Sequence, residues 1–151
     1  MSKRAEMQKL LRYYKEHTGE AALDMHKVAK FAAQMGWDLP EPRSPIDALA
    51  ERFAQAARDE MRKDEGTGRP YRGYHAIPSV PGQGMLWIDI DEASRKPMLK
   101  SLVLRREQMV GDGLQLTLDA DHWNGIHPED EPIVMPMDLT DDIEWRKNSP
   151  D

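Results

Sequence analysis

The clearest apolar pattern in the sequence lies between residues 46 and 61, where apolar side chains recur every three or four positions. The members of this pattern are Ile46, Leu49, Phe53, Ala56, Ala57 and Met61. Such spacing places apolar side chains on one side of a helix. Ser44 suits the N-cap, and Pro45 suits the first helical position, where its missing N–H costs nothing. The pattern therefore predicts a helix over residues 46–63, which the glycines of residues 66–68 end.

Two runs rich in strand-forming residues follow this helix, at residues 69–77 and 85–90. In the second run Leu86 and Ile88 alternate with Trp87 and Asp89, which is typical of a strand with two unlike faces. The runs predict an antiparallel hairpin. Residues 78–84, which join them, are rich in Pro and Gly, and a tip of this length is commonly functional.

The remaining pattern predicts further elements on both sides of this unit. Helical spacing predicts helices over residues 3–17 and 24–35, and Gly19 and Gly36 follow them as terminating glycines. The following elements are expected in the rest of the chain: a Pro-rich connector over 38–45, a helix starting near Ser94 and broken at 111–113, a strand over 114–118, a polar turn over 119–128, an extended segment over 132–139 and a helical turn over 140–145.

These elements predict a helix-rich α+β fold. Residues 1–111 form a three-helix, winged-helix-like bundle with a hairpin in this interpretation. Residues 112–151 add a strand and an extended acidic segment packed on the same domain. A chain of 151 residues is long enough to bury a core without disulfides.

The order of three helices and a hairpin over roughly residues 5–90 resembles the winged helix-turn-helix family. The resemblance implies that the third helix enters the DNA major groove and that the hairpin is the wing. The connector over residues 36–44 is longer than the turn of about 3–4 residues in a tight helix-turn-helix. The strings TGRPYR and RREQMVGD also resemble stretches of short bacterial proteins, but no function follows from that likeness.

The first functional hypothesis is a small DNA-binding protein, either a transcriptional regulator or an accessory factor. Arginine can contact phosphate with two parallel hydrogen bonds. The candidate nucleic-acid contacts are Arg52, Gln55, Arg58, Arg62 and Lys63 on the third helix, and Arg69 and Arg72 on the hairpin. Residues 1–111 carry 19 Lys and Arg against 16 Asp and Glu, so the basic character is modest.

The second hypothesis is a protein-interaction module, either an accessory subunit or a homo-oligomer such as a homodimer. Residues 112–151 carry 2 Lys and Arg against 11 Asp and Glu. Met135, Met137 and Trp145 lie among these acidic residues as candidate partner-binding side chains. Mixed apolar and acidic residues can dock on a basic groove, in this chain or in another, and the hairpin tip is a further candidate surface.

Other function classes lack a signature in the sequence. There is no cysteine, so disulfides and cysteine-based zinc sites are excluded, and the five histidines match no metal motif. No nucleophile motif or phosphate-binding loop is present, and we expect neither an enzyme nor a cofactor. No apolar run reaches the ~18 residues of a membrane span, and the N-terminus lacks an apolar signal core. We therefore expect a cytoplasmic protein without membrane contact.

Overall fold

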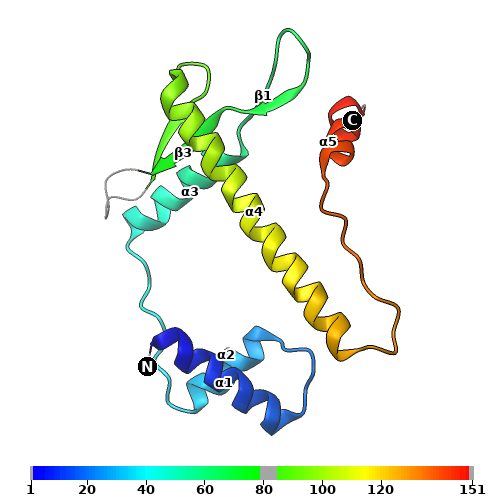
Figure 1. Cartoon of the computed structure of the whole chain (residues 1–151). Coiled ribbons are helices and arrows are strands. Elements are labelled where there is room, and N and C mark those ends of the chain that lie inside the picture. Colours follow the sequence, from blue (N-terminus) through cyan, green and yellow to red (C-terminus); the bar gives the residue numbers. More distant parts are fainter. Residues whose placement is uncertain (1, 79–84, 150–151) are drawn as a thin grey trace. The chain divides into compact units, whose positions relative to one another are not determined.

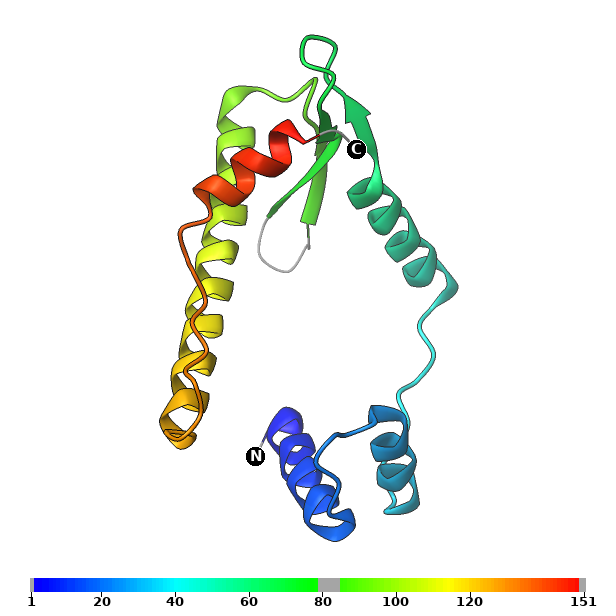
Figure 2. The ribbon, with the colours of Figure 1, turned by 90° about the vertical axis from the view of Figure 1, so that its right-hand side faces the viewer.

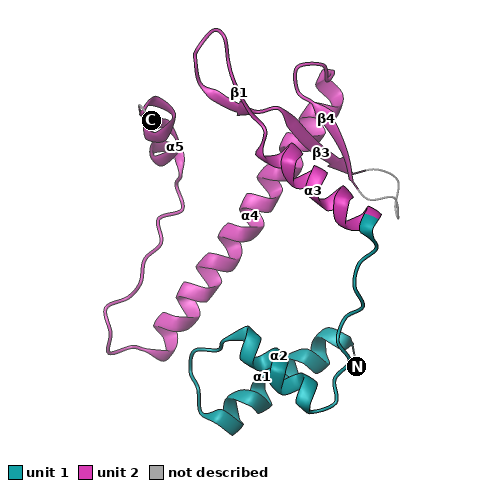
Figure 3. Cartoon of the chain, turned by 180° about the vertical axis from the view of Figure 1, so that it is seen from behind, with its two compact units in different colours: residues 1–45 teal, residues 46–151 magenta. Residues whose placement is uncertain are grey.

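The computed structural model describes residues 2–78 and 85–149, and residue contacts divide the chain into two compact units (Figure 3). The first unit comprises residues 1–45 and the second residues 46–151. The helix-rich α+β class is confirmed. The domain division that the sequence predicted at residue 111 falls inside a continuous helix, whereas the contacts place the division at the Pro-rich connector.

The first unit is a pair of helices, α1 over Lys3–Thr18 and α2 over Met25–Gln34, as predicted. Asp24 caps α2, because its carboxylate accepts a hydrogen bond of 2.9 Å from the His26 N–H. Gly19 ends α1 with a φ of 73°, a conformation that favours glycine. Tyr14 and Phe31 join the helices edge to face, with ring centroids 5.3 Å apart.

The second unit contains three helices and four short strands (Figures 1 and 2). Their bounds are α3 Pro45–Asp59, β1 Met61–Lys63, β2 Pro70–Arg72, β3 Tyr74–Pro78, β4 Met85–Asp89, α4 Arg95–Ile126 and α5 Thr140–Asn148. β1 pairs with β2 and β3 with β4, both antiparallel. The β3–β4 pairing, with His75 opposite Ile88, confirms the predicted hairpin. The proposed tip over residues 79–84 lies outside the described residues.

The third helix is shorter than predicted, because it ends at Asp59 rather than at residue 63. Residues 61–63 instead form β1, with Arg62 opposite Tyr71. The turn between β1 and β2 is built by Asp64, whose carboxylate accepts N–H bonds of 2.9 Å from Gly66 and Thr67. Residues 66–68 therefore turn a hairpin and do not end a helix.

The fourth helix is much longer than predicted, since α4 runs without interruption for 32 residues. Three predictions are therefore wrong for the residues up to Ile126, which are all helical: the break at 111–113, the strand over 114–118 and the polar turn over 119–128. The Thr117 hydroxyl donates to the Gly113 carbonyl at 2.9 Å, so its polar group is satisfied within the helix. The two glycines weaken the helix locally but do not end it when helix-forming residues lie on both sides.

Residues 127–148, here named the C-terminal strap, turn back along α4 (Figure 2). The segment predicted as extended, residues 132–139, belongs to no helix or strand, although Leu139 at its end has a helical backbone conformation, and α5 follows. The Asn124 side chain exchanges two hydrogen bonds of 2.8 Å with the backbone of Ile133. At its far end, the Arg69 guanidinium donates to the Asn148 side-chain oxygen at 2.7 Å. The strap is thus held at both ends within the same unit.

The two central glycines of α4 provide a matched test of this arrangement. A Cβ at Gly111 would contact nothing within 4 Å, whereas a Cβ at Gly113 would lie 2.9 Å from Met137 Cε. We expect Gly111→Ala to raise the free energy of unfolding by about 0.5–1 kcal/mol. Gly113→Ala gains less, because Met137 must move. Denaturant unfolding followed by circular dichroism measures both, and equal gains would contradict the contact between strap and helix.

Candidate functional site

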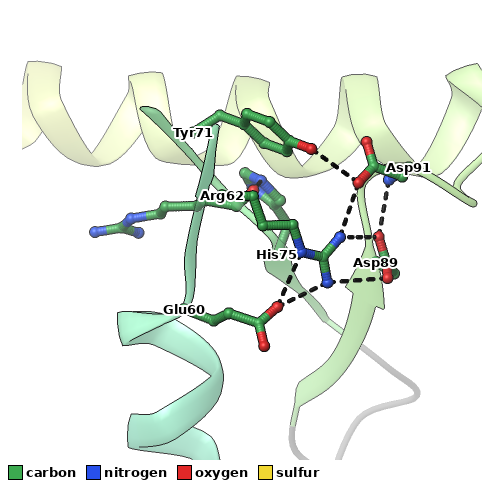
Figure 4. A network of polar contacts seen from close by, with 7 residues as sticks. Glu60, Arg62, Tyr71, His75, Asp89 and Asp91 are labelled. Atoms are coloured by element: carbon green, nitrogen blue, oxygen red, sulfur yellow. Dashed lines mark hydrogen bonds and ion pairs between the residues drawn. The ribbon is translucent and has the colours of Figure 1, made fainter. Parts of the chain in front are cut away.

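A single arginine joins the two small sheets of the second unit. The Arg62 guanidinium donates to Asp89 at 2.7 Å, to Asp91 at 2.9 Å and to Glu60 at 2.7 Å (Figure 4). The Tyr71 hydroxyl donates to Asp91 at 3.0 Å and completes the network. We call Glu60, Arg62, Tyr71, Asp89 and Asp91 the Arg62 network. It connects β1 and β2 to the end of β4.

The network surrounds one positive charge, that of Arg62, with three carboxylates. Hydrogen bonds from Arg62 hold the pKa of Asp89 below its ordinary value. Hydrogen bonds to Asp89, Glu60 and Asp91 raise the pKa of Arg62. Arg62 was a predicted nucleic-acid contact on a helix, but it lies on β1 with its donors directed at these carboxylates. A phosphate would have to displace them to reach it.

The other predicted nucleic-acid residues are dispersed over the second unit. Arg52 and Gln55 lie on α3, where the Gln55 amide donates to Asp59 at 3.0 Å. Lys63 is exposed on β1 rather than on a helix. Arg69 reaches the strap through Asn148. Lys63 and Arg69 line one pocket, Arg52, Gln55 and Arg58 line a second, and Arg58 lines a third together with Arg72.

We call this hollow of about 440 Å³ the arginine pocket. It lies between the end of α3, the β3–β4 hairpin and the first half of α4. Its lining residues are Arg58, Arg72, Tyr74, His75, Ala76, Pro78, Met85, Trp87, Ser101, Leu104, Arg105 and Gln108, with no acidic residue among them. The Arg58 guanidinium carbon lies 5.1 Å from the centroid of the Trp87 ring. The Ser101 hydroxyl donates to the Ala76 carbonyl at 2.8 Å and fixes α4 against β3.

Sequence reasoning missed Arg105, Trp87 and Gln108 as members of this pocket. The basic cluster around Arg105 was visible in the sequence, but its meeting with Arg72 depends on how α4 packs on β3. Spacing along the chain carries no such information. The fixed point is Ser101, which is 1% exposed and lies one helical turn before Arg105.

The second notable surface is α4 itself, which carries large apolar side chains on several sides. Leu99, Val103, Val110, Leu114, Leu116 and Leu118 are each between 46% and 61% exposed. A helix that is apolar all round is normally buried. Among the described residues, no helix is long and apolar enough to cross a membrane.

One face of α4 shows a regular repeat of three and four residues. Stepping ~100° per residue places these residues on one side of the helix. They are Lys96, Lys100, Val103, Glu107, Val110, Leu114, Leu118 and Asp121, here named the α4 stripe. Such spacing is the pattern of a helix that packs against a second helix. Basic residues begin the stripe and an acidic residue ends it.

The predicted partner-binding residues lie on the strap. An apolar groove of about 670 Å³ between α4 and the strap is lined by Met137, Leu139 and Ile143 and, from the α4 stripe, by Val110 and Leu114. The apolar and acidic strap thus lies on α4 of its own chain. Met135 remains 44% exposed and Trp145 73% exposed. Within residues 2–78 and 85–149, no group of three or more His, Asp or Glu side chains is placed to hold a metal ion.

Comparison with known proteins identifies no relative of this chain from which a role for these surfaces could be inferred. No family model, no curated protein and no solved structure matches the chain. The argument for function therefore rests on the geometry and charge of the chain itself.

The Arg62 network predicts a specific acid sensitivity. Because Asp89 has a folded pKa below its unfolded value, its stabilisation is complete above the ordinary pKa of about 4 and is lost as pH falls below it. We expect the melting temperature to fall as pH is lowered from about 5 to about 2, and Asp89→Asn to flatten this dependence. Glu92→Gln, at an exposed neighbouring carboxylate, is the control. An unchanged slope in Asp89→Asn would refute the assignment.

Proposed function

We propose that the protein is an interaction module that assembles with a second copy of itself through the α4 stripe. The observation that carries this proposal is the exposure of Val103, Val110, Leu114 and Leu118 along one side of the helix, each 49–61% exposed. Burying one such side chain contributes on the order of 1.5–3 kcal/mol. A contiguous row of this kind marks a surface that is covered by another protein.

Charge favours a second copy in antiparallel orientation as the partner. The N-terminal half of α4, residues 95–110, carries five Lys and Arg against one Glu, and residues 111–126 carry three Asp and no Lys or Arg. This order opposes the helix dipole, which favours acidic residues at the N-terminus and basic residues at the C-terminus. An antiparallel copy places each basic half beside an acidic half and offsets this cost.

The stripe is also self-complementary in its register. In an antiparallel pair centred between residues 108 and 109, Lys96 of one copy meets Asp121 of the other, and Val103 meets Leu114. Such a two-fold interface presents the same patch from both copies. Gly111 lies beside the stripe and has open space around it, so the helices can approach closely at the centre.

Replacing apolar stripe residues with Asp tests this pairing. We expect Val103→Asp and Leu118→Asp, neither of which lines the groove under the strap, each to weaken dimerisation at least tenfold, because a charge would enter an apolar interface. Leu116→Asp is the control, because Leu116 is similarly exposed at 47% but lies on the opposite side of α4. Sedimentation velocity over a range of concentrations measures the association. A wild-type chain that stays monomeric at high concentration, or equal losses in all three variants, would contradict the proposal.

A charge exchange tests the orientation separately. Lys96→Glu alone and Asp121→Lys alone each place like charges opposite one another in the antiparallel pair. The double variant restores opposite charges and should recover dimerisation. If the double variant is weaker than either single variant, the antiparallel register is wrong even if the chain dimerises.

Nucleic-acid binding is a second candidate function, supported by the meeting of Arg58, Arg72 and Arg105 at one basic pocket. We expect salt-dependent duplex binding at about 50 mM salt, because contacts to phosphate release bound counterions. Arg72→Ala should reduce the affinity and flatten the salt dependence. Arg146→Ala, on α5, is a matched loss of charge away from the pocket. Absence of duplex binding at micromolar protein would dismiss this candidate.

A further inference from the structure

The arginine pocket holds positive charge without a compensating acid. No ion pair or hydrogen bond links the guanidinium of Arg72 or Arg105 to another part of the described chain. Burial and the nearby charge of Arg72 lower the pKa of Arg105. Arg62, in the same unit, has three carboxylate partners. The pocket therefore keeps like charges close together at a cost in stability, which is a common feature of binding sites.

The polar groups beside these arginines are held in place by the backbone around the pocket. His75 is 5% exposed, and its Nε2 lies 2.9 Å from the Arg72 carbonyl, which can only accept. Nε2 therefore donates this bond, and it ties the ring to the backbone of Arg72. Gln108 follows Arg105 on the same side of α4 and adds an amide to the wall. Trp87 and Tyr74 supply flat apolar surface beside these groups.

We propose that the arginine pocket binds the phosphate group of a small phosphate monoester. Arg58, Arg72 and Arg105 would supply the positive charge, and Trp87 with Tyr74 would contact the organic part. A phosphate monoester carries about −1.5 to −2 charges at pH 7, whereas a carboxylate ligand carries only one negative charge. A pocket with several guanidiniums therefore suits the phosphate better than the carboxylate. The volume of about 440 Å³ matches a small-molecule site rather than a surface for a double helix.

This site is distinct from the α4 stripe, because Arg105 and Gln108 lie on a different side of α4 from Val103 and Leu114. It shares Arg58 and Arg72 with the nucleic-acid candidate. The two ideas differ in the ligand, since free phosphate and mononucleotides need only the pocket, whereas a duplex needs a longer row of basic residues. The failure of either can therefore be recognised separately.

The test titrates the full-length protein with inorganic phosphate, adenosine monophosphate and a short DNA duplex, each by isothermal calorimetry at constant ionic strength. We expect adenosine monophosphate to bind more tightly than inorganic phosphate, and Arg105→Gln to weaken both at least tenfold. Arg106→Gln is the matched control, because Arg106 is the next residue, carries the same charge and lies on the opposite groove between α4 and the strap. It should bind as the wild-type chain does.

Three results would overturn the proposal. One is that neither inorganic phosphate nor adenosine monophosphate binds at millimolar concentration. Another is that Arg105→Gln and Arg106→Gln weaken binding equally, which would indicate general charge attraction. The third is that only the duplex binds, which would favour the nucleic-acid candidate instead. Circular dichroism of each variant verifies that the fold is retained, and Arg105→Lys, which keeps the charge, should recover part of the affinity.

Discussion

The pairing of Arg62 with Asp89, Asp91 and Glu60 holds the second unit together. Two-stranded sheets are marginally stable by themselves, and this unit contains two of them. Arg62 joins them from β1, while Gly73 lies between β2 and β3, donating its N–H to Glu60 and accepting from Ile90. A Cβ at Gly73 would lie 2.6 Å from Arg62 Nε, so only glycine fits beside the guanidinium.

The second constraint is that α4 has more apolar surface than its contacts with β3 and the strap cover. Its N-terminal part packs on β3 through Ser101, and the strap covers one side further along. Neither contact buries Val103 or Leu118, which remain about half exposed. A helix can keep such side chains in water only at a cost, and a partner removes that cost. Self-association through the α4 stripe is the proposal that uses both the apolar residues and the division of charge along the helix.

The Arg62 network and the arginine pocket differ in how the charges of their arginines are compensated. In the Arg62 network the single guanidinium is paired with three carboxylates, which joins the two small sheets. In the arginine pocket Arg72 and Arg105 line the same hollow, whose lining residues include no acid, and the charge of Arg72 lowers the pKa of Arg105. The same residue type thus has two roles, and the difference lies in the neighbours. A guanidinium that is already paired stabilises the fold, whereas an unpaired one can take an anion from solution.

The sequence by itself predicted helices over residues 3–17 and 24–35, close to the observed Lys3–Thr18 and Met25–Gln34. It also predicted the start of α3 at Pro45 and the hairpin of β3 and β4, because caps, glycines and local periodicity carry that information. It misplaced the end of α3 and the centre of α4. The spacing of Met61 fitted a helix, but Met61 lies in β1 because that strand pairs with β2. The alternation of Leu114, Leu116 and Leu118 fitted a strand, but these residues continue α4. Which arginines are paired was decided only by the tertiary structure. Arg62 binds carboxylates 27 and 29 residues away, and Arg72 lines the same pocket as Arg105 because α4 packs on β3; no local pattern encodes either arrangement.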